Sequence, residues 1–235
     1  MTTDNTPTII IQDAMTEAGL LAEGTLPNSD QYAKYLRKLR DLIRFEQTQG
    51  LKLFLNTDTT VTLTGGTGTY TFGPTGTVTM TKPLRVVDAY WQDTSGNRRP
   101  LIPLARADYD LLSQVSQQGD ITQYFVDKQS VNLSVTFWQI PTTNVASLGS
   151  PHLVFQVAAT APVTLTETTC FPDEWRTFLV WALADEISSG QPESIMTKCA
   201  TKASQYRGAL EDWDVEDVQT RFTPDSRYLG SSSFR

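Results

Sequence analysis

The sequence has few of the residues that build catalytic, disulfide or metal sites, and it has no long hydrophobic run. Its 235 residues include two cysteines and one histidine. Cys170 and Cys199 cannot form a disulfide framework or a zinc site on their own, so we expect two reduced, buried thiols. The longest apolar runs, such as residues 177–184, fall far short of the roughly 20 residues that a membrane span needs. Residues 1–8 contain no basic residue or apolar run, so we expect neither a membrane span nor a signal peptide.

The residue patterns of an active site are missing as well. His152 stands alone inside an expected strand, and no Ser/His/Asp or Cys/His set can be assembled around it. Neighbouring carboxylates such as Asp108 and Asp110 normally face water, and no cluster has the spacing of metal ligands. The glycine-rich run at 65–68 lacks the Gly-Lys-Ser/Thr of a phosphate loop and is not followed by a helix. We therefore expect no enzyme, no cofactor and no metal.

Charge is low in amount and uneven in place. The chain has 26 acidic and 19 basic residues, a net charge of −7, which argues against a protein whose main task is to grip nucleic-acid phosphates. Both a basic run and an acidic block are usually solvated faces, and the alternative is complementary contact between neighbouring subunits. The basic run comprises Lys34, Arg37, Lys38, Arg40 and Arg44. The acidic block comprises Glu211, Asp212, Asp214, Glu216 and Asp217.

The strongest helical pattern covers residues 28–49. Asn28 and Ser29 stand where an N-cap belongs, and Gly50 follows as a C-terminal glycine would. Four apolar residues recur at spacings of four, three and four, which places them in one stripe of an α-helix: Tyr32, Leu36, Leu39 and Ile43. This stripe needs other helices to pack against.

The candidates for those partner helices lie at the two ends of the chain. A short helix is expected over residues 9–21, and helical spacing resumes at Pro172, a favourable first residue of a helix. Residues 172–190 and 192–213 are predicted to form the last two helices. The apolar stripe of the first of these comprises Trp175, Phe178, Leu179, Ala182 and Ile187.

Between these helical ends the apolar residues alternate, which indicates short, half-buried strands. Strands are expected around residues 51–55, 61–63, 70–72, 78–80, 84–91, 99–103, 124–126, 131–138 and 152–158, with one short helix at 106–114 and a loop at 141–151. The aromatic residues Tyr90, Trp91, Phe137 and Trp138 are expected mainly in the core of these strands, and the alternative is an exposed platform for sugars.

These patterns together predict an α+β fold with a discontinuous helical part. A helical bundle domain is assigned to residues 1–50 and 171–217, an inserted β-rich domain to 51–170, and an extended C-terminal tail to 218–235. The tail has no helical period, but it contains aromatic and basic side chains: Arg221, Phe222, Pro224, Arg227, Tyr228, Phe234 and Arg235.

Three stretches, taken in order, resemble one known family. The first runs from Ile-Gln-Asp-Ala at 11–14 to Gly-Leu-Leu-Ala-Glu-Gly at 19–24. The second is Ile-Pro-Leu-Ala-Arg-Ala-Asp-Tyr at 102–109, followed by Tyr-Phe-Val-Asp-Lys-Gln at 124–129. The third is Phe-Pro-Asp-Glu-Trp at 171–175, leading to Trp-Ala-Leu-Ala-Asp-Glu at 181–186. They resemble the head-to-tail adaptor (connector) proteins of tailed bacteriophages, especially short-tailed ones, over nearly the whole chain.

The resemblance implies a structural, non-enzymatic protein of the virion neck, made in the host cytoplasm. It implies a homo-oligomeric ring, expected to be a dodecamer, that docks between the portal protein and the tail nozzle or tail-fibre proteins. Such a ring retains packaged DNA, which passes through its channel without sequence-specific binding, and it provides a platform for tail attachment. In that family the C-terminal extension reaches the portal, so residues 218–235 are the hypothetical portal-binding segment.

Two further hypotheses concern surfaces. The charged residues Arg37, Lys38 and Arg40 on one side, and Asp212 and Asp214 on the other, are the hypothetical subunit interface. The alternative function is a carbohydrate- or receptor-binding tail module that uses the β-rich insertion, and it requires exposed aromatic side chains.

Overall fold

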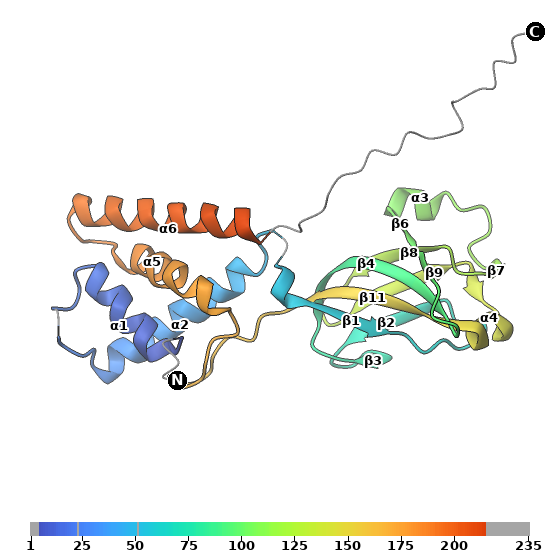
Figure 1. Cartoon of the computed structure of the whole chain (residues 1–235), viewed down its shortest axis with the longest axis horizontal. Helices are drawn as coiled ribbons and strands as arrows, with labels where there is room; N and C mark the ends of the chain where they lie inside the picture. Colours follow the sequence, from blue (N-terminus) through green and yellow to red (C-terminus); the bar gives the residue numbers. More distant parts are fainter. Residues whose placement is uncertain (1–4, 23, 51, 215–235) are drawn as a thin grey trace, which may run out of the picture.

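The computed structural model describes residues 5–22, 24–50 and 52–214. It contains both helices and sheets, with 38% of the chain helical and 26% in strands, so the predicted α+β class is confirmed. Two parts lie end to end (Figure 1). We call them the helical unit, which contains α1, α2, α5 and α6, and the β-rich unit, which contains the strands together with α3 and α4.

The first two helices of the helical unit are α1 (Pro7–Glu17) and α2 (Ser29–Glu46). The predicted N-cap of α2 is confirmed, because Asn28 accepts a hydrogen bond from the Gln31 backbone at 2.9 Å and the Gln31 side chain accepts one from the Asn28 backbone at 2.8 Å. The predicted end at residue 49 is wrong. Helix α2 stops at Glu46, and Gly50 takes its positive φ of 65° in the connection that follows.

Helix α5 (Arg176–Ile187) lies at the centre of the helical unit, between α1 and α6 (Glu193–Trp213) (Figure 1). A short 3₁₀ turn, η2 (Asp173–Trp175), leads into it. The predicted apolar stripe is confirmed, since all five of its side chains are buried: Trp175, Phe178, Leu179, Ala182 and Ile187. Ion pairs attach α1 to both later helices, with Asp13 at 2.5 Å from Arg176 and Glu17 at 2.8 Å from Lys198.

The β-rich unit contains two larger sheets and one short strand pair. The four-stranded sheet has the order β1 (Asn56–Thr60), β11 (Gly149–Val157), β4 (Pro83–Asp93) and β5 (Arg98–Pro100), and all its pairs are antiparallel. The five-stranded sheet has the order β3 (Val78–Thr79), β2 (Thr69–Gly73), β9 (Leu133–Trp138), β8 (Gln123–Lys128) and β6 (Ile102–Leu104). Strands β10 (Ile140–Pro141) and β7 (Gln118–Gly119) form the short parallel pair.

The two larger sheets share one hydrophobic core. Phe72 on β2 and Phe155 on β11 belong to different sheets, and their ring centroids lie 4.8 Å apart. Both side chains are fully buried, as are Leu133, Val135 and Leu153 around them. The sheets therefore pack face to face, and the strands alternate core-facing and outward side chains as expected from their sequence.

Several boundaries inside 51–170 differ from the predictions. The predicted strand at 51–55 is wrong, because residues 53–55 form a 3₁₀ turn, η1 (Leu53–Leu55). Phe54 packs on Phe171 and Trp175, with ring centroids at 5.3 and 5.8 Å, so Phe54 and the neighbouring Leu55 join the helical core and do not enter a sheet. The helix at 106–114 is shorter, α3 (Arg106–Asp110), and the expected loop at 141–151 contains α4 (Thr143–Leu148), which the Thr142 side chain caps.

The buried apolar residues form two separate clusters, one in each unit. We expect a cavity made in one cluster to destabilise that unit much more than the other. Cys199 reports on the helical core, since its thiol is fully buried and burial raises its pKa, which keeps it in the unreactive neutral form. In a Cys170→Ser background, Leu179→Ala should lower the urea midpoint for labelling of Cys199, because such a cavity lowers the free energy of unfolding by about 2–5 kcal/mol.

The matched variant is Phe155→Ala in the core of the β-rich unit, which should leave the midpoint of Cys199 labelling nearly unchanged. Equal shifts for the two variants would contradict this prediction and would mean that the two units unfold together.

Candidate functional site

The residues of the hypothetical interface on α2 differ in their exposure to solvent and in their contacts within the chain. Arg37 is exposed. Lys38 is engaged within the chain, because its ammonium donates to the Glu186 carbonyl at 3.0 Å and lies 3.6 Å from the Glu186 carboxylate. The Nε of Arg40 is buried, and no atom of the described residues accepts a hydrogen bond from it. Of these three residues, Arg37 is therefore the side chain most available to a neighbour.

The acidic residues of the same hypothesis lie at the end of α6. Asp212 is exposed, whereas Asp214 follows the last residue of the helix and is half-buried. Burial lowers the pKa of Lys52 and is the largest effect on it. The negative charge of Asp214 raises that pKa and so opposes the effect of burial. Asp212 is therefore directed to solvent, and Asp214 belongs to a cluster inside the chain. The seven predicted portal-binding residues of the tail lie outside the described residues.

That cluster is the most unusual polar feature of the structure. Glu46 is fully buried, and its carboxylate pairs with Arg207 of α6. Lys52 is 2% exposed, its ammonium lies 4.3 Å from the centroid of the Trp175 ring, and the charges of Glu46 and Arg207 act on it. The cluster thus joins the end of α2, the connection to the β-rich unit and the last turns of α6.

Burial dominates the electrostatics of this cluster. Burial raises the pKa of Glu46 in spite of the nearby charges of Arg207 and Lys52, which lower it. Burial likewise lowers the pKa of Lys52 in spite of the carboxylates of Glu46, Asp214 and Glu211. Each ionised group therefore depends on its partners to remain charged inside the protein.

A second set of polar contacts joins the two units. Gln156 of β11 is fully buried and donates to the backbone oxygen of Gln47 at 3.2 Å, while Arg85 of β4 donates to the Gln156 side chain at 2.6 Å. Arg85 also donates to the Gly50 carbonyl. The Gln47 side chain accepts a hydrogen bond from the Ala159 backbone at 2.6 Å. Both chain segments that connect the two units are therefore held at the end of α2. We call residues 46–50, Lys52, Arg85, Gln156, Ala159 and Arg207 the polar junction.

The sequence contained one signal for the polar junction that the pattern analysis missed. The stripe of α2 continues from Leu39 and Ile43 to Glu46 with the spacing of three that an apolar residue would have. An acidic residue at a core position of a helix indicates a buried ion pair, and its partner Arg207 could not be identified before the structure.

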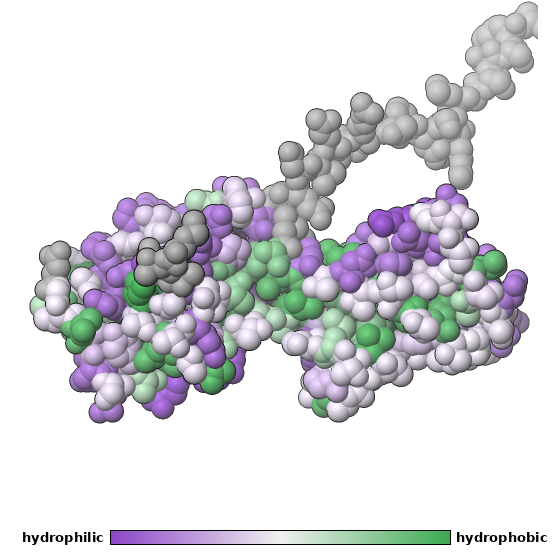
Figure 2. Space-filling model, turned by 60° about the horizontal axis from the view of Figure 1, so that its bottom comes forward, coloured by the Kyte–Doolittle hydropathy of each residue, from purple (hydrophilic) through white to green (hydrophobic). Residues whose placement is uncertain are grey.

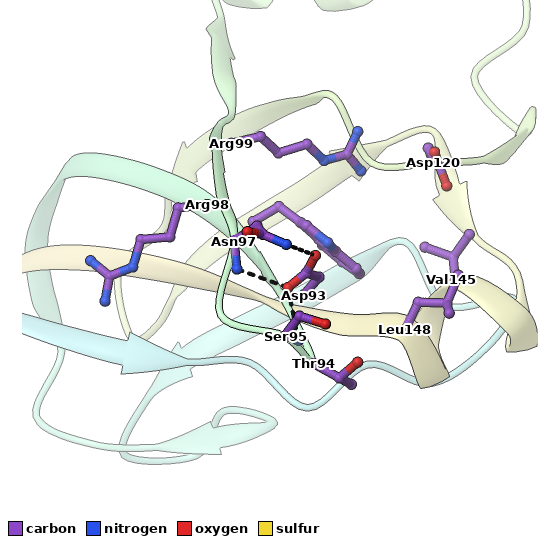
Figure 3. Close-up of a pocket in the computed structure, with 10 residues that line it drawn as sticks. Asp93, Thr94, Ser95, Asn97, Arg98, Arg99, Asp120, Val145 and Leu148 are labelled. Carbon is purple, nitrogen blue, oxygen red and sulfur yellow. Dashed lines mark hydrogen bonds between the residues drawn. The ribbon is translucent and has the colours of Figure 1, made fainter.

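A cavity of about 430 Å³ opens near the turn between β4 and β5, at the other end of the β-rich unit (Figure 3). Its hairpin turn is ordered by Asp93, whose carboxylate accepts hydrogen bonds from the Asn97 side chain and backbone at 2.8 Å and from the Ser95 backbone at 2.9 Å. These bonds lower the pKa of Asp93, with the contact to the Asn97 side chain the largest effect. Arg98 and Arg99 extend from the hairpin in different directions (Figure 3).

This cavity has no catalytic arrangement. Its lining mixes two arginines with Asp93 and Asp120. Within the described ranges, no group of three or more His, Cys, Asp or Glu side chains is placed to hold a metal ion. In the four-stranded sheet, Nδ1 of His152 lies 3.2 Å from the Asp58 carboxylate, and the Thr60 hydroxyl lies 3.4 Å from Nδ1 and 3.5 Å from Nε2. A proton relay requires the hydroxyl to lie along the lone pair of one ring nitrogen, and a hydroxyl at nearly the same distance from both nitrogens is not aligned in this way.

The aromatic residues considered as a sugar platform do not form one. Trp91 and Phe137 are buried in the core of the β-rich unit, as predicted. The Tyr90 ring is stacked on His152 at 4.8 Å between centroids, and the Arg98 guanidinium, from the strand on the other side, lies 4.6 Å from the same ring. Trp138 is half-buried and donates to the Gln114 carbonyl at 3.2 Å. These four side chains therefore leave no open aromatic face of the kind that sugars stack on.

Comparison with known proteins gives the family. The sequence pattern described as SU10 adaptor protein matches residues 9–226, which include both units and the beginning of the segment after α6. The chain belongs to the SU10 adaptor protein family. This is a family of phage head-to-tail adaptors, so the resemblance found in the sequence is confirmed.

Two other observations bear on the adaptor. Its sequence matches none of the curated proteins with which it was compared. Among the described residues, every helix is too short or too polar to span a lipid bilayer. Family membership makes the adaptor a structural protein of a phage, in a family not known for enzymatic activity.

The polar junction generates a prediction about stability. Arg207→Met keeps the apolar stem but leaves the Glu46 carboxylate buried without its strongest partner. We expect the free energy of unfolding at pH 7 to fall by about 3 kcal/mol, as when one member of a buried ion pair is removed. Adding Glu46→Gln should recover most of that loss. Lys202→Met on the same helix is the control and should change stability little. The measurement is urea unfolding.

The direction of the pH dependence follows from the raised pKa of Glu46. Because the pKa of Glu46 is raised in the folded state, the fold favours the protonated carboxyl group. The contribution of this group to stability is therefore present at low pH and is lost as the pH rises through the folded-state pKa. The defect of Arg207→Met should therefore be smaller at pH 5 than at pH 7. A defect that does not change with pH would show that Arg207 acts through packing alone.

Proposed function

We propose that this protein is a non-enzymatic adaptor of the virion neck that forms a ring between the portal protein and the tail. The observation that supports this most strongly is the family match over residues 9–226. In this proposal the ring, expected to have twelve copies, retains packaged DNA in the head and provides the platform on which tail nozzle or tail-fibre proteins assemble.

The arrangement of the two units suits a spacer with two different ends. The helical unit and the β-rich unit lie end to end (Figure 1), and the polar junction fixes the link between them. We assign the helical bundle domain (1–50 and 171–217) to the portal side and the β-rich domain (51–170) to the tail side. A spacer of this kind transmits position only if its two ends keep a constant orientation, and the hydrogen bonds of Gln156 and Arg85 supply that constraint.

The extended tail, residues 218–235, is assigned to portal binding. Helix α6, which precedes this segment, ends at Trp213, beside the polar junction and near the middle of the described part of the molecule (Figure 1). Aromatic and arginine side chains supply much of the binding energy in protein interfaces, and this segment contains both types.

Ring closure requires two different patches of each subunit to meet. Arg37 on α2 and Asp212 on α6 are exposed and of opposite charge, and they lie on helices on different sides of α5. We assign them to the lateral contact, with Lys38, Arg40 and Asp214 at its margin. The net charge of −7 also fits a channel in which DNA phosphates are repelled and the duplex slides without sequence-specific contacts.

The tail assignment is tested by removing residues 218–235. The shortened chain should retain its fold, because the two described cores lie entirely before residue 218, but it should no longer bind the portal ring of the same virus. Circular dichroism checks the fold, and mass measurement of the mixture counts the chains bound. A full-length variant with the tail residues Arg221, Phe222, Arg227 and Tyr228 replaced by serine separates side-chain recognition from length. Undiminished binding by the shortened chain would refute the assignment.

The lateral contact is tested by Arg37→Glu, which reverses a charge that faces solvent. We expect fewer complete rings on the portal at a given chain concentration and a stronger sensitivity to salt, because exposed charges are screened. Lys202→Glu, a charge reversal on α6, is the control. Normal rings from Arg37→Glu would show that this face of α2 is simply solvated.

A further inference from the structure

A mostly apolar cavity opens at the end of the β-rich unit that faces the helical unit. Its volume is about 580 Å³, larger than the cavity of Figure 3, and pockets of this size hold ligands well beyond the size of an indole ring. The segment between β3 and β4, the beginning of β9 and the residue after β11 enclose it, and its apolar lining includes Met80, Pro83, Leu84, Leu133 and Ala158. We call it the junction-side cavity.

The charged residues that line the junction-side cavity are both lysines. Lys82 donates to the Ser130 carbonyl at 2.8 Å, and Lys128 is exposed. Neither ammonium lies within ion-pair distance of a carboxylate of the described residues. The cavity of Figure 3 differs, since two aspartates offset its arginines. The junction-side cavity therefore favours an apolar group that has negative charges beside it.

The chain presents such a group at the end of α6. Trp213 is 62% exposed, although a tryptophan buries a large apolar area when it finds a partner. Glu211 and Asp212 beside it are exposed, and the last turn of α6 contains no basic residue. An exposed tryptophan between acidic residues has the composition of an interface anchor, because tryptophan is enriched among the residues that dominate binding energy.

The positions of the two features match what a ring contact needs. Trp213 is not among the residues that line the cavity of its own chain. The end of α6 lies where the two units meet, and strand β3 lies on the opposite side of the molecule, in the half of the β-rich unit nearer to the helical unit (Figure 1). On the face shown in Figure 2, apolar surface gathers where the units meet and continues onto the near end of the β-rich unit. A closed ring joins two different patches at the same level along its axis.

We propose that Trp213 of one copy inserts into the junction-side cavity of the next copy, with Asp212 of the first beside Lys128 of the second. This inference rests on the proposed ring and names the contact that closes it. Arg37 stays in the same lateral contact, but Lys128 replaces it as the partner of Asp212.

The test is to add the full-length chain, below saturation, to the portal ring of the same virus and to measure how many chains each portal carries by native mass spectrometry. A lateral contact makes binding all-or-none, so empty and fully occupied portals should dominate. Trp213→Ala should reduce the neighbour-to-neighbour cooperativity by about tenfold or more, because it removes a dominant interface tryptophan. The number of chains per portal should then follow a random distribution. Leu111→Ala, which removes another exposed apolar side chain, is the control.

A charge exchange gives a second, independent readout. Asp212→Lys and Lys128→Glu each place like charges at the contact, so each should weaken cooperativity. The two together restore opposite charges and should recover it. Both residues are exposed, so their substitution should not affect folding.

Each outcome decides the matter. Random occupancy for Trp213→Ala, with recovery in the charge exchange, supports the contact. All-or-none binding that survives Trp213→Ala overturns it. Weaker binding of the first chain with unchanged cooperativity also overturns it, because Trp213 would then contact the portal and not the next copy. If the wild-type chain does not bind the portal, the proposed function fails, and sedimentation of the concentrated free chain decides the contact. Self-association lost in Trp213→Ala supports it, and no self-association overturns it.

Discussion

The burial of Glu46 is the constraint on which the rest of the structure depends. Removing a carboxylate from water costs several kcal/mol, and only partners held in a fixed position offset that cost. Arg207 and Lys52 are those partners, and they come from α6 and from the connection to the β-rich unit. Three segments that are far apart in the sequence must therefore meet at one point before the carboxylate is satisfied.

This constraint positions the parts of the molecule that we assign to contacts with other proteins. Because Arg207 is held at the end of α2, the last turn of α6 and its exposed Trp213 are placed beside the link between the units. Because Gln156 and Arg85 bond to residues 47 and 50, the β-rich unit is held in a defined orientation on the same point. Hydrophobic cores stabilise each unit, but they lie on either side of this link and do not orient one unit on the other.

Local patterns predicted most helices well, because their signals are close in sequence. The Asn28 cap and the stripe from Trp175 to Ile187 required only the spacing of neighbouring residues. The failures have a different cause. Leu51, Leu53 and Leu55 alternate like strand residues, but residues 53–55 form a 3₁₀ turn, and Phe54 packs on Phe171 and Trp175, more than a hundred residues later. The partners of Glu46 and the junction-side cavity likewise depend on long-range packing, so no local pattern contains them.

The same reasoning explains which charged residues remain for assembly. Lys38 and Asp214 looked available in the sequence because a charged residue on a helix is usually solvated, but contacts within the chain engage both. Arg37, Asp212 and Lys128 are exposed and make no ion pair with the described residues. Intramolecular pairing thus leaves, from a larger set of surface charges, a few that are not neutralised within the chain and that can attract the neighbouring subunit of the proposed ring. An acidic chain that associates with copies of itself needs such local complementarity, because its net charge alone would keep the copies apart.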